Sequence, residues 1–322
     1  MRELFLGVDG GQSGTTALIA NADGDVLGRG TGGPCNHTSG AEAASKLERV
    51  VRQCVTAACE SAGIAVPDIF EAACFGMSGG PEDKIAVLKQ AVPARRWLIT
   101  DDALIALSGA LEGEPGVIAI AGTGSIAMGR APQGGVRRAG GWGYVFGDEG
   151  GAFDIVRQAL RACLRAEEGW GDGSRLRDMF LAATGCVDMN AALHLFYTPA
   201  WPRSRVARLA VHVDELAAEG DSIAQHLLAN AAQSLALLAQ SVSRQLWLDD
   251  RPDSSPVACS YIGGVFESRV VLHRYTALLE LGGCLVSAPA MGPASGALLE
   301  AYREAGALPD RTKLLSSKFR HE

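Results

Sequence analysis

The sequence predicts an α/β fold of two similarly built domains, and three observations support this prediction. The chain has 322 residues, a length that favours about two domains at roughly 150 residues per domain. Apolar runs typical of strands alternate with runs of helical period in the first third of the chain, as in an α/β layer. A strand, a glycine turn and a second strand span residues 3–20, and the same order recurs at 117–130. This recurrence indicates an architectural duplication.

Residues 1–116 are predicted to form the first domain. Its strands are expected at residues 3–9, 15–20, 25–30, 70–77 and 96–100. Its helices are expected at residues 41–62, 81–90 and 101–111. The longest of these helices is indicated by apolar residues that recur at steps of three and four from Leu47 to Ala58.

The second domain is predicted at residues 117–295, directly after a Gly-Glu-Pro-Gly segment that is typical of a domain boundary. Its strands are expected at residues 117–121, 126–130, 257–262 and 284–287, and its helices at 152–166 and within a helical insertion at about 173–248. A last helix at about 296–308 is expected to pack back on the first domain. The polar tail after Pro309 is expected to be loose.

Composition and charge exclude several classes of protein. The chain carries 29 Lys and Arg against 36 Asp and Glu, a net charge of −7, so it lacks the basic excess that nucleic-acid binding requires. No apolar run reaches the length of about 18 residues that a membrane helix needs, and the start of the chain does not resemble a signal peptide. The eight cysteines are scattered without a CxxC pair, which favours reduced thiols in a cytoplasmic protein.

The first motif that could carry chemistry is the glycine-rich segment from Gly7 to Thr16. A strand delivers Asp9, and a turn then supplies glycine and hydroxyl residues before a second strand begins. Glycines allow backbone N–H groups to approach phosphate oxygens, and hydroxyls add further donors. Asp9 offers a hard oxygen for Mg²⁺, bound through water. An ordinary hairpin turn is the alternative interpretation.

Two further glycine motifs follow in the second half. Gly122–Ser125 repeats the hairpin chemistry of the first motif, and Gly263–Gly264 ends a buried strand before a helix. Paired glycines let a flat ligand such as adenine lie against bare backbone, although strand–glycine–helix junctions are common without any ligand. Two hairpins that each open an α/β half predict a nucleotide site more strongly than one hairpin does.

Two familiar nucleotide signatures are rejected. Residues 28–33 match GxGxxG, but Pro34 follows and the next predicted helix begins only at residue 41. The dinucleotide-binding fingerprint must open a helix directly, so this match does not predict such a site. The P-loop pattern GxxxxGK[ST] is missing from the sequence.

The order of the motifs resembles the actin-like sugar-kinase superfamily. The glycine hairpin is followed by Asp101-Asp102-Ala103 before a helix, then by Gly-Thr-Gly-Ser, and then by a segment at 140–151 with Gly-Gly-Trp-Gly and Gly-Asp-Glu-Gly. Within this superfamily the chain is most similar to the N-acetylglucosamine kinase and BadF/BadG/BcrA/BcrD ATPase group, over residues 4 to about 300. The resemblance implies two actin-like (ribonuclease H-like) ATPase domains around a cleft.

The resemblance also implies a role for each matching residue. Nucleotide contacts fall on Gly10, Gly11, Ser13, Gly14, Thr15, Gly122, Thr123, Gly124, Ser125, Gly263 and Gly264. Sugar contacts fall on Asn36, His37, Asp102, Gly141, Trp142, Gly143 and Asp148. Asp, Asn and His suit this task because they form paired hydrogen bonds to hydroxyls of fixed direction. The structural alternatives are a turn at 36–37, a core position for Trp142 and a helix N-cap at Asp148.

The resemblance places the catalytic carboxylate at Asp102, in the Asp-Ala step before a helix. Asp101 competes for this role, because one of the two aspartates is expected to cap the helix and the other to act as the base. Successive side chains diverge at the end of a strand, so both cannot face one sugar.

The activity implied is ATP- and Mg²⁺-dependent phosphorylation of an amino sugar by a homodimer that binds neither nucleic acid nor membrane. N-acetylglucosamine is the first acceptor expected, at its 6-hydroxyl, and glucosamine is the second. An ATPase activator of a reductase is the alternative from another class, but Cys163 and Cys186 lack that family's cluster context. A repressor of the sugar-kinase type is disfavoured because the first hairpin starts at Gly7 and the CxCGxxGCxE zinc signature is missing.

Overall fold

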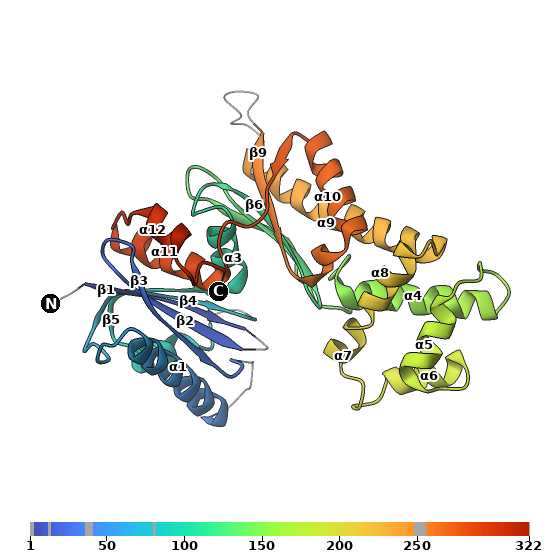
Figure 1. Cartoon of the computed structure of the whole chain (residues 1–322), viewed down its shortest axis with the longest axis horizontal. Coiled ribbons are helices and arrows are strands. Elements are labelled where there is room, and N and C mark those ends of the chain that lie inside the picture. The colour runs from blue at the N-terminus through green and yellow to red at the C-terminus, as the bar shows by residue number, and fades with distance from the viewer. Residues whose placement is uncertain (1–2, 12–13, 36–40, 80–81, 248–255, 322) are drawn as a thin grey trace. The chain divides into compact units, whose positions relative to one another are not determined.

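The computed structural model of the chain describes residues 3–11, 14–35, 41–79, 82–247 and 256–321. The chain divides into two compact units (Figure 1). Unit 1 comprises Met1–Gly116 and Ala288–Glu322, and unit 2 comprises Val117–Ser287. Each unit contains a five-stranded sheet with helices, so the predicted α/β class is confirmed. Unit 1 resumes at Ala288, earlier in the chain than the predicted return at about residue 296.

The sheet of unit 1 has the strand order β3-β2-β1-β4-β5. The strands are β1 (Leu4–Gly10), β2 (Thr15–Asn21), β3 (Val26–Gly32), β4 (Phe70–Met77) and β5 (Ala94–Asp101). The first three strands pair antiparallel, whereas β4 pairs parallel with both β1 and β5. The helices of this unit are α1 (Ala41–Ser61), α2 (Ile85–Ala91), α3 (Asp102–Ala110), α11 (Pro293–Ala305) and α12 (Arg311–Ser316).

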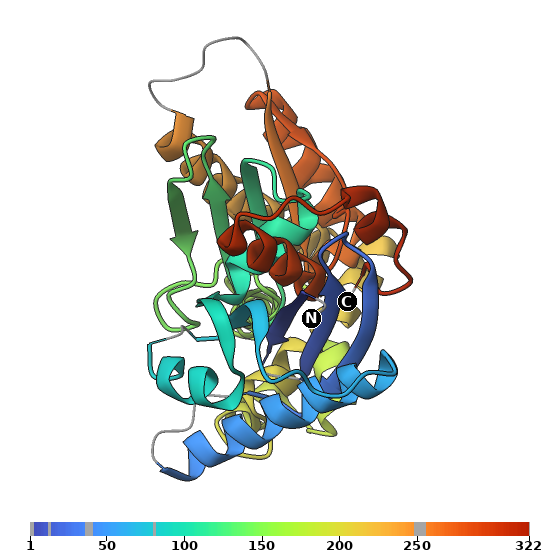
Figure 2. The ribbon, with the colours of Figure 1, turned by 90° about the vertical axis from the view of Figure 1, so that its left-hand side faces the viewer.

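Two helices cover opposite faces of this sheet, α1 on one side and α11 on the other (Figures 1 and 2). Alternate residues of β1 point to the two faces. Leu6 and Val8 pack in the apolar cluster that includes α1, while Phe5 packs in the cluster of α11. The ring of Phe5 lies 4.3 Å from the ring of Tyr302 in α11, centroid to centroid.

The glycines of the rejected GxGxxG match have a packing role. A Cβ atom at Gly28 would lie 2.2 Å from the carbonyl oxygen of Ala58, and one at Gly30 would lie 2.0 Å from that of Cys54. Both carbonyls belong to α1. The two glycines therefore let α1 lie directly on β3, which any larger residue would prevent.

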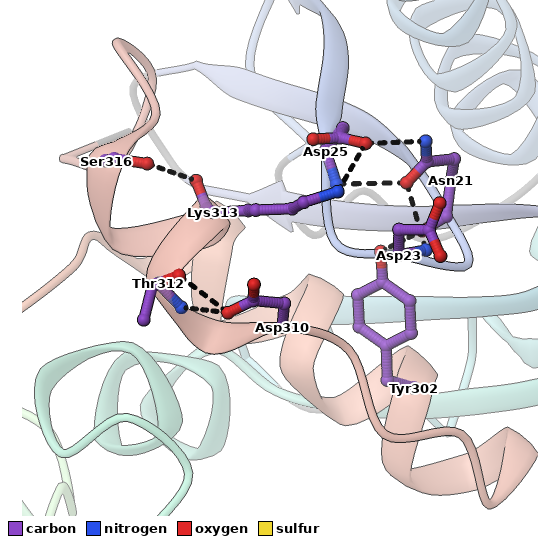
Figure 3. A network of polar contacts seen from close by, with 8 residues as sticks. All are labelled: Asn21, Asp23, Asp25, Tyr302, Asp310, Thr312, Lys313 and Ser316. Atoms are coloured by element: carbon purple, nitrogen blue, oxygen red, sulfur yellow. Dashed lines mark hydrogen bonds and ion pairs between the residues drawn. The ribbon is translucent and has the colours of Figure 1, made fainter.

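The prediction of a loose tail is wrong for the described residues after Pro309. They form α12, which packs on the rest of unit 1 (Figure 3). Leu314 is buried in the cluster of α11. The Lys313 Nζ lies 2.9 Å from the Asp25 Oδ2, and the Asp310 side chain caps α12 by accepting from the Thr312 N–H at 2.9 Å. Polar composition here reflects ion pairs and a helix cap rather than a disordered end.

The sheet of unit 2 has the strand order β10-β9-β6-β7-β8. The strands are β6 (Gly116–Ala121), β7 (Ser125–Arg130), β8 (Val136–Gly140), β9 (Val257–Ile262) and β10 (Cys284–Val286). The strand β8 was not predicted. All of its residues are exposed or half-buried, and it lacks the apolar run that marks the other strands.

The helices of unit 2 include the predicted insertion. They are α4 (Ala152–Glu167), α5 (Leu176–Thr184), α6 (Met189–Phe196), α7 (Arg203–Ala207), α8 (Ala210–Ala218), α9 (Ser222–Trp247) and α10 (Arg269–Leu281), with the short 3₁₀ helix η1 (Gly264–Glu267). Their apolar faces and the sheet share one core. Among the described residues, no individual helix has the length and apolar character to cross a membrane, and the bent pair α5–α6 meets both conditions only when taken together.

Candidate functional site

In unit 1, the carboxyl ends of three parallel strands bring two aspartates to one edge of the sheet. Asp9 lies near the end of β1, and Asp102 begins α3 directly after β5. The register pairs Asp9 with Gly76 of β4, and β4 in turn pairs Met77 with Asp101 of β5. The Ser78 N–H donates to the Gly10 carbonyl at 3.0 Å, which ties the end of β4 to the first glycine motif.

The two carboxylates of this edge influence each other. Burial, and next the negative charge of Asp102, raise the pKa of Asp9 from 3.8 to about 6. Two half-buried carboxylates of like charge favour a cation nearby. Within the described residues, no group of three or more His, Cys, Asp or Glu side chains is arranged around a common point. The two carboxylates of Asp9 and Asp102 fit Mg²⁺, which is usually held by one or two carboxylates together with substrate phosphates.

A residue that the sequence did not single out orients Asp102. The Ser78 hydroxyl donates to the Asp102 Oδ2 at 2.6 Å. The signal that could have found it is the Ser-Gly-Gly end of β4, at the same sheet edge as Asp9. Asp101 is the N-cap residue of α3, but its side chain makes no capping hydrogen bond. The predicted capping bond is therefore wrong, although the position is correct.

In the first glycine hairpin, one hydroxyl that was predicted to contact phosphate forms a hydrogen bond within unit 1 instead. Thr15 is buried; its hydroxyl donates to the Gly33 carbonyl at 2.8 Å and lies 2.9 Å from the Cys35 Sγ. Its single hydroxyl proton is thus engaged, which opposes the predicted side-chain contact to phosphate. Gly11 and Gly14 close the turn through a 2.9 Å backbone hydrogen bond. The predicted residues Ser13, Asn36 and His37 lie outside the described residues.

In unit 2, the hairpin at Gly122–Ser125 is tied to the start of α4. The Ala152 N–H donates to the Gly122 carbonyl at 2.9 Å, and the Phe153 N–H donates to the Thr123 carbonyl at 3.1 Å. The Ser125 hydroxyl is buried and donates to the Glu149 carbonyl at 2.7 Å. As at Thr15, the hydroxyl of Ser125 holds the fold together, and this opposes its predicted use as a phosphate donor.

The Gly263–Gly264 motif lies against the second hairpin. Gly263 has a φ of +110°, and a Cβ atom there would lie 2.4 Å from the Ala121 carbonyl oxygen. Only glycine allows the end of β9 to approach the end of β6 this closely. Two motifs that are more than a hundred residues apart in the sequence therefore meet at one end of the sheet of unit 2.

A pocket of about 480 Å³ opens beside these two motifs. Its lining includes Gly122, Thr123, Gly264, Val265, Asp214 and Ser268. Further lining comes from α7 and α8 through Ala207 and Val211. The wall thus combines glycine backbone, hydroxyl groups and charged groups with apolar side chains. Both the size and this mixture are typical of a small-molecule site.

The segment at 140–151 forms a loop with several left-handed residues. Positive φ angles occur at Gly140, Gly141, Gly143 and Gly150. The side chain of Trp142 is exposed, with a relative accessibility of 67%. The Arg138 guanidinium lies over its ring, 5.3 Å from the ring centroid. The alternative of a core position for Trp142 is therefore wrong.

Asp148 is buried beside the second hairpin. Its φ is +64°, and its Oδ2 accepts a hydrogen bond from the Arg203 Nη2 at 2.6 Å. A Cβ atom at Gly124 would lie 2.5 Å from this Oδ2. The N-cap residue of α4 is Gly151, so the alternative of an N-cap at Asp148 is wrong.

The structure brings the predicted residues together as two separate sets. Asp9, Gly10 and Asp102 share the sheet edge of unit 1. Asp148 and the two glycine motifs of unit 2 lie together at one end of the sheet of that unit. Arg203, which no sequence signal indicated, joins the second set.

Comparison with known proteins relates the chain to one family. The sequence profile of the BadF/BadG/BcrA/BcrD ATPase family matches residues 6–301. An N-acetyl-D-glucosamine kinase from Dictyostelium discoideum is 30% identical over 84% of this chain and 88% of the relative. An N-acetylmuramic acid/N-acetylglucosamine kinase from Clostridium acetobutylicum is 28% identical over 82% and 85%. The crystal structure of a proposed N-acetylglucosamine kinase from Chromobacterium violaceum superposes with a TM-score of 0.70, at 27% identity, over 92% of this chain and 98% of the other.

Proposed function

Because the chain belongs to the BadF/BadG/BcrA/BcrD ATPase family, we propose that it is an ATP-dependent kinase that phosphorylates N-acetylglucosamine at the 6-hydroxyl. The observation that carries this proposal is the pocket in unit 2, whose wall combines Gly122 and Thr123 with Gly264. Glucosamine is the second acceptor that we expect. The similarity to an N-acetylmuramic acid/N-acetylglucosamine kinase adds N-acetylmuramic acid to the sugars to be tested.

The pocket supports nucleotide binding through bare backbone. The Gly122 N–H donates to the Gly124 carbonyl at 3.0 Å and closes the turn. A phosphate therefore approaches Thr123, whose backbone N–H and hydroxyl act as donors. Adenine lies against Gly264 and the apolar side chains of Val265 and Val211, all of which line the same pocket. The hydroxyl of Thr123 has this role because those of Thr15 and Ser125 are engaged within the fold.

Asp102 acts as the general base in this proposal. Its Oδ2 accepts from the Ser78 hydroxyl, which fixes the rotation of the carboxylate. The other oxygen accepts the proton of the sugar hydroxyl as that hydroxyl attacks the γ-phosphorus of ATP, while the bond from this phosphorus to the bridging oxygen breaks and ADP leaves. Phosphoryl transfer needs positioning and charge neutralisation more than covalent help, and a positioned base contributes roughly 10²–10⁴-fold.

The carboxylates of unit 1 also suit a divalent cation. Asp9 is half-buried at the end of β1, and desolvation together with the nearby charge of Asp102 raises its pKa. Asp9 would hold Mg²⁺, which when bound neutralises phosphate charge during transfer.

Asp148, Gly141, Trp142 and Gly143 are proposed to contact the sugar. Asp148 offers a carboxylate for hydroxyls, and the exposed Trp142 ring offers an apolar face. We also expect a homodimer in the cytoplasm, with no nucleic-acid or membrane partner.

A screen of acceptors tests the proposed function. ADP release is coupled to a dehydrogenase reaction and followed with N-acetylglucosamine, glucosamine, N-acetylmannosamine, N-acetylmuramic acid and glucose. The proposal expects the highest kcat/KM for an N-acetylated amino sugar and little ADP release without any sugar. Equal, sugar-independent ADP release would contradict it and would favour an ATPase activator of a reductase.

The activator alternative is disfavoured by the surroundings of one of its two candidate cysteines, Cys163. Cys163 is buried in the core of unit 2, and burial raises the pKa of its thiol to about 12. A cluster ligand must be a thiolate. An iron determination on anaerobically purified protein is expected to find no stoichiometric iron.

A further inference from the structure

One ion pair in unit 2 involves a residue to which neither the sequence motifs nor the pocket gives a role. The Arg203 side chain, the first residue of α7, donates from Nη2 to the Asp148 Oδ2 at 2.6 Å. The carboxylate side chain is only 7% accessible, whereas the arginine side chain is 34% accessible. The guanidinium also lies 5.2 Å from the ring of Tyr144, in the same loop as Asp148, and 5.9 Å from the ring of Phe153.

The surroundings hold this arginine in one place. Tyr144 and Phe153 contact each other edge to face, with their centroids 5.3 Å apart, and Arg203 lies over both rings. Gly124 leaves room for the pair, because a Cβ atom there would lie 2.5 Å from the Asp148 Oδ2 and 2.7 Å from the Arg203 Nη2. A planar guanidinium that both stacks and donates cannot be replaced by the point charge of a lysine without loss.

Asp148 needs such a partner for two physical reasons. A carboxylate buried this deeply is costly to keep ionised unless a cation pairs with it. Its φ of +64° is a left-handed conformation that a residue other than glycine keeps only when its surroundings impose it. The ion pair meets the first need and contributes to the second. It also occupies one oxygen, so that Oδ1 is the oxygen left to accept a sugar hydroxyl.

We propose that Arg203 is a positioning residue for the sugar site: its ion pair with Asp148 turns that carboxylate so that one of its oxygens accepts one sugar hydroxyl. The inference rests on the proposed function, in which Asp148 contacts the amino sugar. Arg203 itself contacts neither the sugar nor the reacting atoms in this scheme.

The helix α7 provides a matched control. Arg205 is also stacked on an aromatic ring, with its guanidinium 4.1 Å from the Trp201 ring, and it donates to the Ala200 carbonyl at 2.9 Å. Neither of these two contacts of Arg205 involves Asp148. Comparing substitutions at 203 and 205 therefore separates the effect on Asp148 from a general loss of an arginine in this helix.

The test measures sugar KM, nucleotide KM and kcat for Arg203→Gln, Arg203→Lys and Arg205→Gln. We expect Arg203→Gln to raise the KM for N-acetylglucosamine about tenfold or more, as is typical when a hydrogen bond to a charged group is lost. The nucleotide KM should stay within about twofold. Arg203→Lys should recover part of the loss because it restores the charge, and Arg205→Gln should resemble the wild type. A uniform fall in kcat with an unchanged sugar KM would overturn the inference.

Deoxy sugars make the test specific to one hydroxyl. The 3-deoxy and 4-deoxy analogues of N-acetylglucosamine are assayed with the wild type and with Arg203→Lys. This variant retains the positive charge, and it keeps the test possible should Arg203→Gln fail to fold. For one analogue, the loss of kcat/KM caused by the substitution and the loss caused by removal of the sugar hydroxyl should be non-additive, because both changes remove the same hydrogen bond. Additive losses for both analogues would overturn the inference. A wild type that phosphorylates no amino sugar would instead refute the proposed function, so the two failures are distinguishable.

Discussion

Replacing Asp9 by asparagine is expected to stabilise the ligand-free protein at neutral pH. The amide is nearly the same size as the carboxylate, but it carries no charge to bury. Burial and the charge of Asp102 raise the pKa of Asp9 from 3.8 to about 6. A difference of about two pKa units corresponds to about 3 kcal/mol at roughly 1.4 kcal/mol per unit. Asp9→Asn should therefore gain up to about 3 kcal/mol of unfolding free energy at pH 7.

The sign of the pH dependence follows from proton binding. Between pH 4 and 6 the folded protein binds a proton at Asp9 that the unfolded chain has already released, so stability falls as pH rises through this interval. The cost is absent below the unfolded pKa and complete above the folded one. The stability difference between Asp9→Asn and wild type should grow from near zero at about pH 4 to its full value above about pH 6.5.

Urea unfolding at a series of pH values, without Mg²⁺ or nucleotide, measures this difference. Asp68→Asn is the matched control, since Asp68 is exposed in the same unit and its substitution should change stability by about 0.5 kcal/mol or less. A stability difference that does not vary with pH, or an asparagine variant less stable than the wild type at pH 7, would refute the electrostatic account of this edge.

Three further predictions concern single side chains. Asp102→Asn should lower kcat by roughly 10²–10⁴ with little change in nucleotide affinity, whereas Asp101→Asn, whose side chain makes no capping bond, should keep most activity and stability; comparable loss in both variants would contradict the assignment of the base. Thr123→Val should raise the ATP KM with an unchanged Tm, and a collapse of the Tm would mean that the hairpin is structural. Leu314→Ala should cost about 2–5 kcal/mol, because this side chain is fully buried; a thermal shift near zero would show that α12 does not pack as described.

The fold was largely predictable because its signals are local. Apolar runs and helical periods marked most elements, and the three glycine motifs fell at strand ends, where backbone must approach backbone or ligand. At Gly263 the requirement is explicit, since a Cβ atom would meet the Ala121 carbonyl. The match at Gly28 and Gly30 shows the limit of such signals: the same residue type serves helix packing rather than phosphate binding.

What the sequence could not supply were partnerships set by the tertiary structure. Arg203 is 55 residues from Asp148 and lies in a helical stretch with several other arginines. The hydroxyls of Thr15 and Ser125 read as phosphate donors until their partners inside the fold are known. The segment at α12 is polar because its contacts are ion pairs and a cap, and polarity alone predicts a loose end.

The most direct test of the central claim is the stoichiometry of products, followed by ³¹P NMR with N-acetylglucosamine, ATP and Mg²⁺. An amino-sugar kinase forms one sugar phosphomonoester for each ADP, with the new resonance coupled to the protons on carbon 6, and no inorganic phosphate accumulates. Release of inorganic phosphate at the same rate with and without the sugar, and without a phosphomonoester signal, would contradict the account.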